Sequence, residues 1–174
     1  SAVVTGGANG IGRALARSFA GAGASVAIVD LDVAAASALR DEIVASGGRA
    51  IAVRCDVARY DEVEALAATV YEQLGDVAVL CNNAGIGGGV GAEAIDVPIS
   101  DWEAVLGVNL FCVIHGVHAF APRMAASGAR THIVNTASMA AFLVGPRSGP
   151  YTTSKFAVLG LSEVVRAELA PRGV

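Results

Sequence analysis

The chain has 174 residues, of which 54% are hydrophobic and 16% are charged, and its formal net charge is −4. This length and apolar content predict a single domain, residues 1–174, with a sizeable core. The charge argues against nucleic acid as a partner, because phosphate binding needs clustered Lys and Arg. No uninterrupted apolar run reaches the roughly 18 residues of a membrane span, and no signal-peptide pattern is present, so we expect a soluble, cytoplasmic protein without a membrane partner.

Short β-branched runs alternate with longer helical stretches along the chain. In chain order we expect a strand at 2–5, a helix at 11–22, a strand at 25–30, a helix at 33–46, a strand at 50–54, a helix at 61–74, a strand at 77–81, a helix at 100–126, a strand at 131–135 and a helix at 151–169. Strands that alternate with helices pair in parallel through crossover connections. The sequence therefore predicts a doubly wound, three-layer αβα fold around a parallel sheet.

Individual residues indicate where the helices begin and bend. Asp32 is expected to cap the second helix. Ser100 and Glu103 have capping-box spacing and are expected to open the long fourth helix. Pro122 is expected to bend that helix, because proline removes a backbone donor and clashes with the preceding turn.

The strand count suggests a truncated sheet. We count five strands, whereas the two halves of a doubly wound sheet usually supply about six. The sequence closes on Arg172-Gly173-Val174, where a further strand is expected to begin. A sheet with these ends leaves an edge uncovered, so we expect the last strands to lie outside these residues.

A glycine-rich turn, residues 5–12, joins the first strand to the first helix. Gly6, Gly10 and Gly12 follow a GxxxGxG spacing, which differs from both GxGxxG and the lysine-bearing P-loop, so a nucleotide triphosphatase is disfavoured. Glycines permit a tight turn and close backbone approach to a pyrophosphate at the helix N-terminus. A turn with a purely structural role is the alternative.

Acidic residues follow the next two strands. Asp30 ends the second strand, where a carboxylate accepts hydrogen bonds from the adenosine ribose and repels a 2′-phosphate. Asn9 stands where a basic residue would meet that phosphate, so the pair favours NAD over NADP. Asp56-Val57, after the third strand, offers a carboxylate to the adenine amino group. The alternative for Asp30 is a solvated carboxylate at a strand end.

A candidate catalytic group lies near the end of the chain. Tyr151 and Lys155 are spaced i, i+4 on one helix face, where an ammonium favours the phenolate form of a tyrosine. Ser138 follows the fifth strand, at the sheet edge where such folds bind ligands, and its hydroxyl suits a substrate carbonyl. Asn82-Asn83-Ala84-Gly85 follows the fourth strand at the same edge. A solvated helix pair and ordinary turns are the alternatives.

Together these motifs resemble the short-chain dehydrogenase/reductase family in its ordinary soluble form. The residues that carry the resemblance are the turn 5–12, the run 82–85, Asn109, Ser138 and the run 151–155. The resemblance implies a Rossmann-like fold and an NAD-dependent oxidoreductase that transfers a hydride between NAD(H) and a secondary alcohol or ketone. It also implies a further strand and a C-terminal substrate lid, which these residues do not contain.

The resemblance implies a role for each site residue. Tyr151 is the general acid or base, Lys155 supports it and binds the nicotinamide ribose, and Ser138 positions the substrate oxygen. Asn109, otherwise read as a buried, backbone-bonded helix residue, holds a water in a proton relay behind Lys155. The expected cofactor-binding residues are Gly6, Asn9, Gly10, Ile11, Gly12, Asp30, Asp56, Val57, Asn83, Ala84, Gly85, Tyr151 and Lys155. Asn82 is expected to line the adenosine side and to support the central strand.

The substrate and the assembly are less closely specified. Segments 86–98 and 139–150 should flank the substrate, and the apolar residues of the second predict a largely apolar alcohol or ketone. The resemblance implies a homodimer or homotetramer. The candidate contact residues, which otherwise face only the sheet, are Phe111, Val113, Val158, Leu161 and Val165. A non-catalytic dinucleotide-binding module and an epimerase or lyase on the same fold remain alternative functions.

The remaining chemistry-bearing residues are expected to be structural. Cys55, Cys81 and Cys112 form no CxxC pair, which favours buried, reduced thiols. His115 and His118 share a helix face without further ligands, so we expect packing or a subunit interface rather than a metal site.

Overall fold

The structure is a computed structural model that describes residues 1–88 and 91–174. Five parallel strands form one sheet in the order β3-β2-β1-β4-β5. The strands are β1 (Ala2–Thr5), β2 (Val26–Asp30), β3 (Ala50–Arg54), β4 (Val79–Asn82) and β5 (His132–Asn135). After β3 the chain crosses to the other side of β1, so the strand order reverses between β1 and β4. This arrangement confirms the predicted doubly wound fold.

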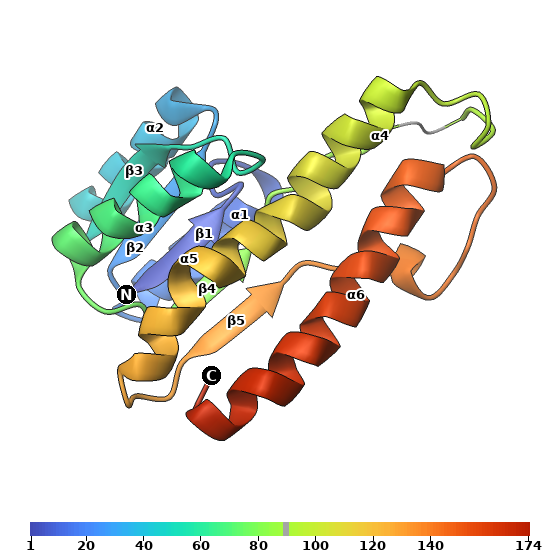
Figure 1. Ribbon diagram of the computed structural model, residues 1–174. Coiled ribbons are helices and arrows are strands. Elements are labelled where there is room, and N and C mark those ends of the chain that lie inside the picture. Colours follow the sequence, from blue (N-terminus) through green and yellow to red (C-terminus); the bar gives the residue numbers. More distant parts are fainter. Residues whose placement is uncertain (89–90) are drawn as a thin grey trace.

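Helices cover both faces of the sheet (Figure 1). They are α1 (Gly10–Gly21), α2 (Val33–Ala45), α3 (Tyr60–Leu74), α4 (Ile99–Leu106), α5 (Cys112–Ala126) and α6 (Gly149–Leu169). α1 and α2 pack on one face through an apolar cluster that includes Ile28 and Leu39. α3, α5 and α6 pack on the other face through a cluster that includes Val29, Leu66 and Phe120. Each expected element is present within two residues of its predicted bounds.

The N-terminus of α2 agrees with the prediction from the sequence, whereas that of α4 does not. Asp32 caps α2, because its side chain accepts a hydrogen bond from the Ala35 N–H at 3.0 Å. The capping box at Ser100 is wrong, since α4 begins at Ile99. The carbonyl of Pro98 already accepts the first helical N–H groups, which places Ser100 inside the first turn. Proline suits this boundary because its missing N–H would have no helical partner there.

The predicted long helix runs from Ile99 to Ala126 and contains a π-helical turn, Gly107–Phe111, between α4 and α5. Pro122 lies inside α5, which continues past it to Ala126. Within the described part of the chain, this helix alone is long and apolar enough to cross a membrane, with a mean hydropathy of 1.8. Val113, Phe120 and Met124 nevertheless bury one of its faces against the sheet, which is typical of a core helix.

Two of the expected subunit contacts are wrong. Val113 and Val158 are fully buried in the cluster between the sheet and its helices, so neither is available to a partner. Leu161 packs partly against the same cluster. Phe111 is 46% exposed and remains a candidate for such a contact.

The cysteines behave as expected. Cys55, Cys81 and Cys112 are free and buried. Burial raises the pKa of Cys55 and Cys81 to about 11 and that of Cys112 to about 12. All three therefore stay protonated near neutral pH and are poor nucleophiles.

Candidate active site

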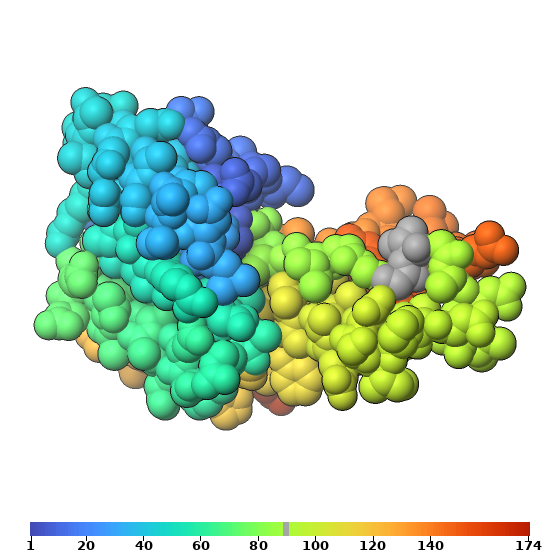
Figure 2. All heavy atoms as spheres, turned by 90° about the horizontal axis from the view of Figure 1, so that it is seen from above, coloured from blue at the N-terminus to red at the C-terminus, as the bar shows by residue number. Residues whose placement is uncertain are grey.

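A cleft of about 730 Å³ opens at the carboxyl ends of the strands. It lies where the strand order reverses between β1 and β4, which is the general position of ligand sites in doubly wound sheets. Figure 2 shows the surface hollowed between the N-terminal elements, in blue, and the orange segment before α6. Loops that follow all five strands contribute to the lining.

The cleft brings together nearly all of the predicted site residues. Those that line it are Gly6, Asn9, Gly10, Ile11, Asp30, Asp56, Val57, Asn83, Ala84, Gly85, Ser138, Tyr151 and Lys155. Gly12 and Asn109 lie behind this lining. The other lining residues were not predicted as cofactor or catalytic residues, although Ile86 and Gly87 belong to the segment 86–98 that was expected to flank the substrate. They are Leu31, Cys55, Ile86, Gly87, Val108, Thr136 and Ala137. Most of these are neighbours of predicted residues at the same strand ends, so the strand-end rule could have found them.

The glycine turn is shaped by contacts that no side chain would allow. A Cβ on Gly12 would lie 2.0 Å from the Gly6 carbonyl oxygen and 2.7 Å from Asn83 Nδ2. Gly6 and Gly10 have positive φ values of 60° and 53°, which favour glycine. In the described structure the Asn9 side chain does not cap α1. The N–H groups of its first turn therefore remain available for an anion.

Thr5 joins the glycine turn to the end of β4, a role that the sequence reading missed. Its Oγ1 accepts hydrogen bonds from the Asn83 N–H at 2.9 Å and the Ala84 N–H at 3.1 Å, and donates to the Cys81 carbonyl at 3.3 Å. Asn83 Nδ2 donates in return to the Thr5 carbonyl at 3.0 Å. These contacts fix the floor of the cleft between two neighbouring strands.

Asn82 does not line the cleft as expected. It is 2% exposed, and its Nδ2 donates to Asn135 Oδ1 at 2.9 Å. The alternation of side chains along β4 turns it toward α5, where its side chain lies against Gly116. The hydrogen bond to Asn135 joins β4 to β5, the strand at the edge of the sheet.

Asp30 is held rigidly at the edge of the cleft. Its Oδ2 accepts the Ala8 N–H at 3.0 Å, and its Oδ1 accepts the Asp32 N–H at 3.1 Å. Two backbone donors therefore orient the carboxylate before any ligand binds, and Leu31 lies beside it in the lining.

Tyr151 and Lys155 reach the cleft from the start of α6. Lys155 is 4% exposed, and its Nζ donates to the Thr136 carbonyl at 2.8 Å. The same nitrogen lies 5.7 Å from the centroid of the Tyr151 ring. Ser138 lies three residues after the end of β5, and its Oγ accepts the Ala140 N–H at 3.2 Å. A phenol, an ammonium and a hydroxyl thus share one wall of the cleft.

Asn109 lies in the π-helical turn and is 1% exposed. Its Oδ1 accepts the Ile86 N–H at 2.8 Å, and its Nδ2 donates to the Ile86 carbonyl at 3.0 Å and to Ser154 Oγ at 3.1 Å. Ser154 Oγ donates to the Tyr151 carbonyl at 2.7 Å. The side chain therefore links the loop after β4 to the helix that carries Tyr151 and Lys155.

Comparisons with known proteins agree with this geometry. A family model described as short chain dehydrogenase matches residues 1–174. The 1-deoxy-11-beta-hydroxypentalenate dehydrogenase of Streptomyces exfoliatus is 42% identical over 174 residues, which are 100% of this chain and 63% of that protein. The chain thus spans less than two thirds of that relative's length.

Solved structures have the same fold. A short-chain dehydrogenase/reductase from Burkholderia phymatum in complex with NAD has a TM-score of 0.94 and 41% identity, over 99% of this chain and 60% of that one. A metagenomic short-chain oxidoreductase in complex with NADP also has a TM-score of 0.94, with 38% identity over 99% of this chain and 76% of that one. With its sheet order, its glycine turn and a family match over its whole length, the chain belongs to the short-chain dehydrogenase/reductase family.

Proposed function

We propose that the protein is an oxidoreductase that transfers a hydride between NAD(H) and a secondary alcohol or ketone. The observation that carries the proposal is that Tyr151, Lys155 and Ser138 share one cleft with the glycine turn. A phosphate-binding turn and a proton-transfer group are both needed for this chemistry, and they lie at opposite ends of the sequence.

The cleft fits a dinucleotide at both of its ends. Because Gly12 has no side chain, the glycine turn lies close against the start of α1. A pyrophosphate bound there can accept hydrogen bonds from the backbone N–H groups of the helix. Asp30 offers carboxylate oxygens to ribose hydroxyls, and Lys155 offers an ammonium at the other end. When bound, the nicotinamide ring supplies the hydride chemistry.

The protein's own residues handle the proton. In oxidation the phenolate of Tyr151 accepts the proton of the substrate hydroxyl, and in reduction its phenol returns one. Lys155 Nζ lies 5.7 Å from the centroid of the Tyr151 ring, so a positive charge lies beside the group that exchanges the proton. Ser138 already accepts the Ala140 N–H, so its own O–H is the group that donates to the substrate oxygen. Asn109 is buried behind these residues, and we propose that it holds a water of the proton relay.

The surface beside Ser138 supports an apolar substrate. Met139, Phe142, Leu143 and Val144 are between 65% and 75% exposed, although their side chains favour burial. A substrate seated there would remove these groups from water. In the facing segment 86–98, residues 89 and 90 lie outside the described residues.

The proposal is tested by following reduced-nicotinamide absorbance with the purified protein across a panel of apolar secondary alcohols and ketones, with NAD and NADP in parallel. We expect turnover of at least one apolar substrate that depends on an added cofactor. NAD that stays bound through purification without net reduction would instead favour an epimerase or lyase. No turnover and no cofactor binding would contradict the proposal.

Asp30 is proposed to set the preference for NAD. The Asp30→Asn change keeps the size of the side chain and one acceptor oxygen but removes the charge that opposes a 2′-phosphate. We expect the ratio of kcat/KM for NAD to that for NADP to fall by about tenfold or more, because like charges in contact are strongly unfavourable. Asp32→Asn is the matched control, since Asp32 caps α2 and asparagine also caps well. An unchanged ratio, or a wild-type preference for NADP, would overturn this assignment.

A further inference from the structure

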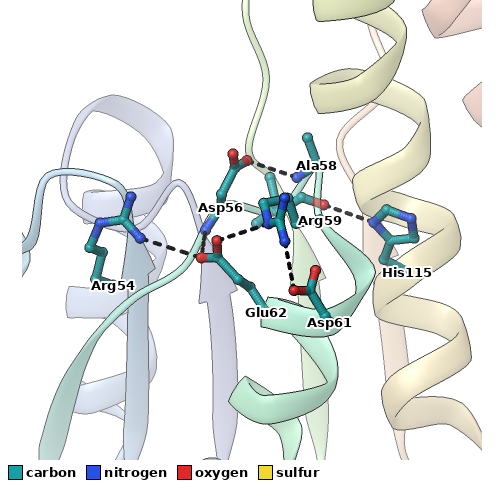
Figure 3. Close-up of polar contacts among 8 residues, drawn as sticks. Arg54, Asp56, Ala58, Arg59, Asp61, Glu62 and His115 are labelled. Atoms are coloured by element: carbon teal, nitrogen blue, oxygen red, sulfur yellow. Dashed lines mark hydrogen bonds and ion pairs between the residues drawn. The ribbon is translucent and has the colours of Figure 1, made fainter.

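The loop Asp56–Ala58 follows β3 and contributes Asp56 and Val57 to the cleft, and side chains from two directions hold its backbone. The Asp56 N–H donates to Glu62 Oε2 at 2.8 Å, and the Asp56 carbonyl accepts the Arg59 N–H at 3.0 Å. Asp56 Oδ1 accepts the Ala58 N–H at 3.0 Å, so the carboxylate is also oriented. Figure 3 shows this carboxylate pointing away from Glu62, toward Ala58.

Glu62 lies in the first turn of α3 and is itself held from two sides. Its Oε2 lies 3.3 Å from Arg54 Nη1, and its Oε1 lies 3.2 Å from Arg59 Nε. With the Asp56 N–H, three donors share one carboxylate (Figure 3). Since both arginines are largely exposed, the contribution of these ion pairs to stability is small, and the bond to Asp56 is the contact that reaches the cleft.

His115 holds the same loop from the opposite side. Its Nδ1 lies 2.9 Å from the Val57 carbonyl oxygen, which can only accept, so Nδ1 carries the proton. The ring centroids of Tyr60 and Phe111 lie 5.6 Å and 5.9 Å from the centroid of the His115 ring, and these packing contacts hold its orientation. The His118 ring packs edge-on against Tyr60, with the ring centroids 6.1 Å apart. His115 therefore both packs against aromatic rings and donates a hydrogen bond to the loop.

We propose that Glu62 and His115 are positioning residues that hold the loop Asp56–Ala58 in the shape that receives the adenine half of the cofactor. The inference rests on the proposed function of the cleft. Neither side chain is among those that line it, so they act through Asp56 and Val57. A loop that is already ordered loses less conformational entropy when a ligand binds, so the two contacts strengthen adenine binding without taking part in proton transfer.

The first test uses His115. His115→Phe keeps an aromatic ring but removes the donor, whereas His115→Asn places an amide N–H near the position of Nδ1. We expect His115→Phe to raise the Kd of NAD and of ADP-ribose about fivefold, the effect of one neutral hydrogen bond. Inhibition by nicotinamide mononucleotide, and kcat at saturating NAD, should not change. His115→Asn should restore most of the affinity for NAD and ADP-ribose that His115→Phe loses. His118→Phe, three residues away on the same helix, is the matched control and should behave as wild type.

The second test uses Glu62 in the same assays. Glu62→Ala removes the acceptor of the Asp56 N–H and should raise the Kd of NAD and ADP-ribose by about fivefold. Glu62→Gln keeps an acceptor and loses only the exposed ion pairs, so its Kd values should stay close to those of wild type. Urea unfolding of each variant reports whether the fold is equally stable.

The outcomes separate the inference from the function on which it rests. If wild type binds NAD and ADP-ribose but the variants bind them equally well, the positioning role is wrong. It is also wrong if nicotinamide mononucleotide is affected as strongly, if kcat falls, or if His118→Phe matches His115→Phe. If wild type binds neither NAD(H) nor ADP-ribose, the proposed function fails and the inference fails with it.

Discussion

Replacing Tyr151 by Phe is expected to lower kcat by about 10²- to 10⁴-fold, the usual contribution of general acid–base catalysis. The phenol oxygen is the group proposed to move the proton, and phenylalanine keeps the ring beside Lys155 without it. Because the glycine turn and Asp30, rather than the Tyr151 hydroxyl, are proposed to hold the pyrophosphate and the adenosine ribose, the Kd of NADH should change little. Steady-state turnover and NADH fluorescence titration measure the two quantities separately.

Tyr71→Phe is the matched control for that experiment. This variant also removes a tyrosine hydroxyl, but one on α3. The Tyr71 hydroxyl donates to the Phe120 carbonyl at 3.3 Å and does not reach the cleft. We expect nearly full turnover from this variant, with a small loss of stability. If Tyr151→Phe also keeps full turnover, Tyr151 is not the proton-transfer group. If it leaves the physiological function intact as well, a non-catalytic dinucleotide-binding module is favoured.

Replacing Gly12 by Ala is expected to lower the free energy of unfolding by about 3 kcal/mol, at the upper end of the usual cost of overpacking. The new Cβ would lie 2.0 Å from the Gly6 carbonyl oxygen, and neither backbone segment can move aside easily. Moving the turn would also disturb Asn83, whose Nδ2 would lie 2.7 Å from that Cβ. NAD binding should therefore weaken together with stability, as measured by urea unfolding and by titration.

Gly21→Ala in the same helix controls for the change of residue type. A Cβ on Gly21 meets no atom within 4 Å, and alanine is a better helix former than glycine. We expect no loss of stability and no change in NAD affinity for this variant. If the variants at Gly12 and Gly21 were equally stable, the close approach in the glycine turn would not be a packing requirement.

Most of the cleft could be predicted because it lies at one edge of a parallel sheet. Asp30, Asn83 and Ser138 each follow a strand, and the carboxyl ends of parallel strands meet at the same edge. Their distances along the sequence are then unimportant. Tyr151 and Lys155 were found from their spacing, but it was the shared edge that gave the pair a possible role.

The residues that were missed act through contacts between distant segments. His115 bonds to Val57 across 58 positions, and Thr5 bonds to Asn83 across 78. Both residues belong to local patterns, Thr5 to the glycine turn and His115 to the pair with His118, but neither pattern indicates these contacts. Each side chain bonds to a backbone group that becomes a neighbour only after folding. The misplaced cap at Ser100 has a local cause, because Pro98 supplies the first carbonyl of the helix and makes a side-chain cap unnecessary there.

The sequence by itself determined the doubly wound fold and the glycine turn, because these follow from alternating periodicity and from residues at strand ends. The family was identified from the resemblance of its motifs taken together. The sequence did not determine which apolar helix residues are free for a partner. Val113 and Val158 were expected as candidate subunit contacts, yet the sheet and its helices bury them. Only the tertiary structure decided this, and it also tied the loop Asp56–Ala58 to Glu62 and His115, since such contacts depend on how helices pack on the sheet rather than on local propensity.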